Sequence, residues 1–118
     1  MITMYYIVCQ DDSFSSQFDG GYIWEPAESE ALLKLRVGDT ILHDVKGEIK
    51  AVSKVTQEWQ TATAPGCMKE KYGTGHAGHV ILCQGQMAEH PVAFQPDCGD
   101  SFCVISETEG INLVSSIK

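Results

Sequence analysis

Short apolar runs separated by polar turns make up most of the chain, a pattern typical of a β-rich protein. Residues 3–10 (TMYYIVCQ) are β-branched and aromatic and precede the polar stretch DDS, so they predict a buried first strand, followed by a loop as far as Gly21. After Pro26, acidic residues give way to apolar and then basic ones between positions 28 and 36. This order predicts a short helix that ends before Gly38.

The clearest element is a hairpin in the middle of the chain. Residues 40–45 (TILHDV) and 48–55 (EIKAVSKV) flank Lys46-Gly47, and glycine readily takes the positive φ that a two-residue turn requires. Because side chains alternate between faces along a strand, the second strand has two distinct sides. Ile49, Ala51 and Ser53 are expected on one side, and Lys50, Val52 and Lys54 on the other.

The rest of the chain also predicts strands. Residues 60–78, rich in Thr, Ala, Gly and Pro, predict a long loop, residues 79–87 and 102–106 predict strands, and residues 111–117 predict a last strand. Many short strands with one helix favour a half-open β-barrel over a parallel α/β sheet, which needs alternating helices. Because 118 residues suit one domain and no repeat or linker divides them, residues 1–118 are expected to form a single domain.

Charge is distributed unevenly along the chain. The net charge is −8, with six acids and no base in residues 1–33, seven bases and five acids in residues 34–71, and one base and five acids in residues 72–118. An acidic chain is a poor general binder of nucleic acid, since nonspecific affinity comes mainly from Lys and Arg at phosphates. A local basic face on an acidic body remains open. The candidate phosphate contacts are Lys46, Lys50, Lys54, Lys69 and Lys71.

Cysteine use and hydropathy indicate a protein of the cytoplasm. No apolar run approaches the roughly 20 residues that span a bilayer, and the start lacks the basic flank and cleavage pattern of a secretory signal, so no membrane partner is expected. An odd number of cysteines without framework spacing is typical of reduced thiols. They are Cys9, Cys67, Cys83, Cys98 and Cys103.

Two motifs in the first half are similar to those of a known family. The segment GGYIWEP (residues 20–26), followed by VGD and then ILHDVKGEIKAVS (residues 41–53), resembles the EVE family of the PUA-like superfamily. There a GGxxWxP segment precedes GDxIxHY and a strand that ends near AxS. The resemblance implies an α+β, β-rich pseudo-barrel of the EVE or YTH type, with one or two short helices.

The same resemblance implies a modified-base reader. Related domains hold a methylated adenine between aromatic side chains or read DNA for modification-dependent restriction enzymes. Carried over by position, Trp24 matches the pocket tryptophan, His43 the family histidine and Ser53 the serine that closes the strand. Tyr22 and Trp59 would extend the pocket wall.

The resemblance therefore implies a binding module without a cofactor or catalytic residues of its own. Its ligand would be a methylated or hydroxymethylated base, flipped from DNA rather than taken from RNA. A nuclease or NTPase domain or subunit would be its partner in a restriction system.

Alternatives remain because the match is incomplete. The family's His-Trp pair is missing, and Asp44 replaces the tyrosine after His43, which leaves open an RNA-associated or small-molecule-binding PUA-like domain. A Cys/His metalloprotein or a thiol enzyme is a further alternative, although the soft ligands lack the paired C-x2–4-C spacing of structural zinc sites, and no metal is expected. Those ligands are Cys67, His76, His79 and Cys83.

Overall fold

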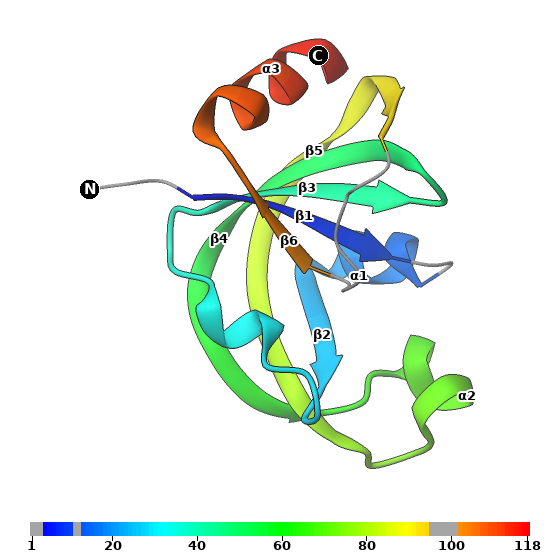
Figure 1. Cartoon of the computed structure of the whole chain (residues 1–118). Coiled ribbons are helices and arrows are strands. Elements are labelled where there is room, and N and C mark those ends of the chain that lie inside the picture. The colour runs from blue at the N-terminus through cyan, green and yellow to red at the C-terminus, as the bar shows by residue number, and fades with distance from the viewer. Residues whose placement is uncertain (1–3, 11–12, 95–101) are drawn as a thin grey trace.

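A six-stranded sheet curls into a half-open barrel (Figure 1). The computed structural model describes residues 4–10, 13–94 and 102–118, so Thr3 of the first expected strand and Cys98 lie outside the described residues. The strands are β1 (Tyr5–Gln10), β2 (Tyr22–Pro26), β3 (Thr40–Val45), β4 (Glu48–Thr63), β5 (Ala77–Ala93) and β6 (Phe102–Ile105). The helices are α1 (Phe14–Gly20), α2 (Lys69–Tyr72) and α3 (Glu107–Ile117), with 3-10 turns η1 (Ala31–Lys34) and η2 (Gly66–Met68).

The strand order is β2-β5-β4-β3-β1-β6. β1 runs parallel to β3, and the other neighbouring pairs are antiparallel. The long strands β4 and β5 form a curved ribbon whose concave side holds η1 (Figure 1). The expected fold class, a β-rich α+β pseudo-barrel, is confirmed, although the described part of the chain has three α-helices rather than one or two.

The expected hairpin is confirmed as β3 and β4. Lys46 and Gly47 both have positive φ, 55° and 87°, as a tight turn between twisted strands requires. Asp44, which stands where the EVE motif has tyrosine, accepts a hydrogen bond at Oδ1 from the Gly47 N–H at 3.0 Å. Burial raises the pKa of the Asp44 carboxyl, and the Gly47 bond opposes that shift. Asp44 therefore fixes the turn.

The sheet has two covered faces. We call inner the face on which β1 to β5 and the η1 segment share one apolar cluster, and outer the opposite face. The inner cluster consists of Val8, Ile23, Leu32, Leu35, Ile41, Val55, Ile81 and Cys83. The outer face of β1, β3 and β4 packs under α3 around Ile7, Leu42, Ile49 and Ile117. Ile49 was expected on the side of Ala51 and Ser53, but the strand register shifts between Ile49 and Ala51, and Ile49 packs with Val52 instead.

The prediction of a last strand at residues 111–117 is wrong, because this segment belongs to α3. Ser106 caps the helix by accepting a hydrogen bond from the Glu109 N–H at 3.1 Å, and acidic Glu107 and Glu109 suit its first turn. Gly110 lies against the Tyr5 ring, where a Cβ would overlap it. The β-branched residues of the segment suggested a strand, but packing on the sheet outweighed that weak preference.

Three other boundaries differ from expectation. The loop expected before Gly21 contains α1, which ends at Gly21 in the left-handed conformation, φ 72°. The helix expected after Pro26 is reduced to the 3-10 turn η1. The long loop expected over residues 60–78 is shorter, because β4 continues to Thr63 and β5 begins at Ala77. No helix among the described residues is long and apolar enough to cross a membrane.

Candidate functional site

Trp24 lies on β2, where its ring is buried against the outer face of the sheet. Its partner across the strands is Val80, and only 2% of its surface is exposed. The indole Nε1–H donates a hydrogen bond to the Ala62 carbonyl at 3.0 Å. The ring can approach the sheet this closely because Gly78 has no side chain, and a Cβ there would overlap the indole. The orientation of the Trp24 ring is thus fixed by its hydrogen bond and by the close approach to Gly78.

The cover over Trp24 is the connection between β4 and β5, residues 64–76, which we call the covering segment. Its Met68 packs against the indole, and its Tyr72 ring lies 5.3 Å from the indole centroid at 64°. His76 lies 6.3 Å from the same centroid, and its Nε2 is 3.2 Å from both carboxylate oxygens of Glu28. A backbone hydrogen bond and the His76 contact lower the pKa of Glu28.

A small cavity of about 60 Å³ opens beside Trp24. Ligand pockets have roughly 300 Å³ or more, so a base requires the covering segment to move outward. The cavity lies where the end of β1, α1, β2 and the covering segment meet. Its lining includes Gln10, Ser13, Gln17, Trp24, Lys71 and Tyr72.

One side of the cavity is fixed by α1. Gln17, which is 1% exposed, accepts a hydrogen bond at Oε1 from the Trp24 backbone N–H and donates from Nε2 to Ser13 Oγ, both at 2.8 Å. Both polar atoms of the Gln17 amide are thus engaged in holding the start of β2 against α1. This bond orients the backbone of Trp24.

Tyr22 lies two residues before Trp24 on the same face of β2 and packs in the same cluster. Its hydroxyl is 3.6 Å from Cys67 Sγ on the covering segment. Burial, reinforced by Cys67, raises the pKa of Tyr22 to about 12. Tyr22 therefore supports the cluster around Trp24 but is not among the residues that line the cavity.

His43 and Ser53 lie inside the barrel, not in the cavity with Trp24. His43 is 1% exposed; its Nε2 is 2.6 Å from Ser53 Oγ and its Nδ1 is 2.7 Å from Gln10 Oε1. The rings of Phe14 and Phe18 on α1 cover the imidazole at 5.5 and 5.6 Å. Burial lowers the pKa of His43 to about 4. The expected pair is brought together, but Gln10 separates it from the cavity.

Trp59 is not brought together with Trp24. Its ring is 38% exposed and packs edge-on against His79 at 5.1 Å. His79 and Val80 are consecutive on β5, so they point to opposite faces, and Val80 shares the face of Trp24. The expected extension of the pocket wall by Trp59 is therefore corrected.

The candidate lysines fall into two regions. Lys69 and Lys71 belong to α2 in the covering segment; Lys71 lines the cavity, and its Nζ lies 5.4 Å from the Tyr72 ring centroid. Lys54 instead lines a groove beside Val114 of α3. Lys46 and Lys50 belong to the β3–β4 hairpin.

The soft ligands considered for a metal also lie in separate surroundings. Cys67 contacts Tyr22, His76 pairs with Glu28, and His79 packs on Trp59. Cys83 is buried, and burial raises the pKa of its thiol. Among residues 4–10, 13–94 and 102–118, no three metal-binding side chains gather closely enough to hold an ion.

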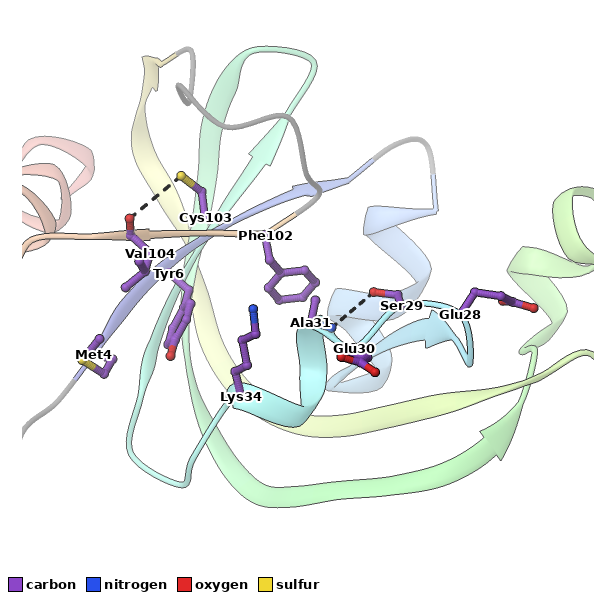
Figure 2. A pocket seen from close by; sticks show the side chains of 10 residues that line it. All are labelled: Met4, Tyr6, Glu28, Ser29, Glu30, Ala31, Lys34, Phe102, Cys103 and Val104. Atoms are coloured by element: carbon purple, nitrogen blue, oxygen red, sulfur yellow. Dashed lines mark hydrogen bonds between the residues drawn. The ribbon is translucent and has the colours of Figure 1, made fainter.

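A larger groove of about 830 Å³ lies between β6 and the segment before and within η1. Figure 2 shows Phe102 and Lys34 extending towards each other across it, with Glu28 and Glu30 along one side. Its size suits a ligand. Its carboxylates, however, repel phosphate groups and disfavour a nucleic-acid strand there.

Sequence reasoning missed Gln10, Gln17 and Tyr72. Gln10 ends a strand and Gln17 lies in a segment expected to be a loop, so neither gave a local signal. The aromatic Tyr72 lies within a segment whose position over β2 depends on long-range packing. Only the tertiary arrangement identifies these residues.

Comparisons with known proteins support the fold. No family model and no curated protein matches the sequence. The YTH domain of Zygosaccharomyces rouxii MRB1, solved with N6-methyladenosine RNA, matches with a TM-score of 0.69 and 12% identity over 98% of this chain and 87% of that one. The Pho92 YTH domain, solved with m6A, matches with a TM-score of 0.67 and 12% identity over 98% and 84%.

Bacterial proteins share the architecture as well. Rpa0253 of Rhodopseudomonas palustris matches with a TM-score of 0.61 and 15% identity over 98% of this chain and 92% of that one. Atu2648 of Agrobacterium tumefaciens matches with a TM-score of 0.60 and 11% identity over 96% and 92%. The chain therefore has the β-rich pseudo-barrel fold of these YTH domains.

Proposed function

We propose that this chain is a reader that binds a methylated or hydroxymethylated nucleobase beside Trp24. The observation that carries the proposal is the aromatic pair of Trp24 and Tyr72 at a cavity, with ring centroids 5.3 Å apart. Two structural neighbours of the same fold were solved with N6-methyladenosine RNA or m6A, which makes N6-methyladenine the first ligand to test.

The energetics suit a base taken out of its stack. Extruding a base from a duplex costs a few kcal/mol. Stacking on one aromatic face returns about 1–3 kcal/mol, and two faces could offset the cost. A buried methyl group adds about 0.8 kcal/mol.

Binding requires the covering segment to open. The segment is held by the Ala64–His76 backbone hydrogen bond of 2.9 Å, by Met68 against the indole and by the Glu28–His76 contact. These contacts join the segment to its own ends, to Trp24 on β2 and to the loop after β2. In the open state, the base would replace Met68 and Tyr72 on the indole, or insert between Tyr72 and Trp24.

The polymer and the wider system are further parts of the proposal. The resemblance to EVE proteins and restriction-system readers supports DNA, a nuclease or NTPase partner, and action in the cytoplasm without catalysis by this chain. RNA is the alternative, because one YTH neighbour was solved with RNA.

The test is a titration of labelled oligonucleotides by fluorescence anisotropy. DNA and RNA of one sequence would carry N6-methyladenine, 5-methylcytosine, 5-hydroxymethylcytosine or no modification. We expect one modified base to bind more tightly than its plain counterpart. Trp24→Ala should weaken that binding about 5- to 150-fold, the equivalent of one lost stacking face.

Two further variants control for folding. Tyr72→Ala changes a half-buried side chain and should also weaken binding while circular dichroism stays native. Trp59→Phe should leave the preference unchanged, because Trp59 packs on His79 and not on Trp24. Equal affinity for modified and plain bases, or a preference that survives both Trp24→Ala and Tyr72→Ala, would exclude the reader function. Tighter binding to RNA would move the proposal from DNA to RNA.

A further inference from the structure

Gln10 connects the cavity beside Trp24 with the buried polar pair inside the barrel. It lines the cavity at the end of β1, and its Oε1 lies 2.7 Å from His43 Nδ1. The other cavity-lining amide, Gln17, uses both of its polar atoms on Ser13 and the Trp24 backbone. Gln10 is thus the amide that has an atom left for a ligand.

The Gln10 amide oxygen faces Nδ1 of His43, and this arrangement corresponds to one tautomer of the ring. The amide Oε1 of Gln10 only accepts, so Nδ1–H must donate to it. A neutral imidazole then accepts at Nε2, so the Ser53 hydroxyl donates to it across 2.6 Å. The low pKa of His43 agrees with a neutral ring.

Cys83 is also buried in the barrel, 3% exposed. Burial raises the pKa of its thiol, and Ser53 opposes that rise. The two hydrogen bonds of the imidazole run in one direction, from Ser53 through His43 to Gln10.

We propose that Gln10 recognises the edge of the bound base as a hydrogen-bond donor, and that His43 and Ser53 are positioning residues that keep its amide turned with Nε2 towards the cavity. The proposal rests on the proposed base-binding function. It assigns the ligand a ring nitrogen that accepts a hydrogen bond at this position. Turning the amide by 180° would present Oε1 instead and would require the proton of His43 to move from Nδ1 to Nε2, with the Ser53 hydroxyl as its acceptor.

The test combines ligand and protein changes. Oligonucleotides carrying N6-methyladenine would be compared with their 1-deaza, 3-deaza and 7-deaza analogues, in which one ring nitrogen becomes C–H. One analogue should bind wild-type protein about 2- to 13-fold more weakly, the fold-change of a single net hydrogen bond. That difference should vanish in Gln10→Leu.

Gln10→Glu should weaken binding further, because its carboxylate keeps the shape but presents an acceptor. The matched control is Gln84→Glu, which makes the same change at an exposed site in the groove beside α3. It should leave the deaza pattern as in wild type.

A second readout tests the positioning residues without any ligand. Nitrogen-15 NMR of the His43 ring should show a proton on Nδ1 and none on Nε2. In Ser53→Ala, Nε2 loses its donor, so the ring is free to move its proton, and both the Nδ1–H form and the deaza difference should diminish. If the Ser53 hydroxyl had only a structural role, Ser53→Ala would change stability but leave the pattern of binding to the deaza analogues as in wild type.

The outcomes separate this inference from the proposed function. Binding that depends on Trp24 but shows the same deaza losses in wild type and Gln10→Leu would overturn the role of Gln10 and leave the reader function in place. An Nε2–H ring in the wild-type protein would overturn the positioning chain. Failure of every modified oligonucleotide to bind would overturn both proposals.

Discussion

His43 has a role that its position in the motif does not reveal. The imidazole is buried and packs under Phe14 and Phe18, so it contributes to the barrel interior as an uncharged ring. In the unfolded chain the same ring would take up a proton near pH 6.5. The folded protein therefore excludes a proton that the unfolded chain binds, and this difference can be measured.

The free energy of unfolding should decrease at acidic pH because of His43. Its pKa is about 4 in the folded protein and 6.5 for an unfolded chain, so protons bind preferentially to the unfolded chain between these values. Above pH 6.5 the effect is absent. As the pH falls to about 5, the loss reaches about 2 kcal/mol of unfolding free energy. Urea unfolding at about pH 7, 6 and 5 would measure it.

The control for this prediction is His43→Asn, which has no titrating ring. The variant should be less stable at neutral pH, because it breaks contacts with Gln10 and Ser53, but its stability should decline less on acidification. Equal declines in the two proteins would show that His43 binds a proton as readily when folded.

Among the elements, those specified by local rules were predicted correctly and those specified by packing were not. The β3–β4 hairpin was predictable because Lys46-Gly47 defines its turn. Its faces were predicted only in part, because the register shift between Ile49 and Ala51 breaks the alternation. Most of α3 was predicted as a strand. Its helical conformation depends on the Ser106 cap and on packing against Tyr5, and this packing is known only from the structure. The same holds for the residues of the site. The sequence motif indicated Trp24, whereas the placement of Trp59 on the opposite face of the sheet from Trp24 depends on long-range strand register.

The pairing of β2 with β5 leads to a prediction for Gly78. A Cβ at this position would overlap both the Trp24 ring and the Glu25 carbonyl oxygen. Gly78→Ala should therefore displace the indole and destabilise the fold by about 1–3 kcal/mol, the usual cost of overpacking. Thermal unfolding and the anisotropy titration together would show lower stability and weaker binding of the modified oligonucleotide.

Gly66→Ala provides the matched control. Gly66 lies in the covering segment, has no atom within 4 Å of a built Cβ, and does not need a positive φ. The same substitution there should leave the position of Trp24 and the affinity unchanged. If Gly78→Ala binds as tightly as Gly66→Ala, the placement of the indole against the sheet does not determine affinity.

The whole molecule is acidic, and two of its lysines lie close to Trp24. The net charge of −8 opposes general binding to phosphates, whereas Lys69 and Lys71 lie on the segment that covers Trp24. Lys54 faces a groove next to α3 instead. A pocket-dominated reader with two nearby phosphate contacts should thus bind plain duplex weakly and show a shallow dependence on salt.

This charge arrangement predicts which lysines set the salt dependence. Two phosphate contacts on B-DNA give a slope of about −1.8 for log K against log salt, and removing one contact reduces it by about 0.9. Lys69→Ala and Lys71→Ala should each produce that reduction in titrations of the modified duplex between 50 and 200 mM salt, about the range over which such slopes are measured. Lys50→Ala and Lys54→Ala remove the same charge from the hairpin and should leave the slope unchanged. The reverse result would place the nucleic-acid backbone along β4, and the strand would then have to leave the pocket towards α3 rather than across α2.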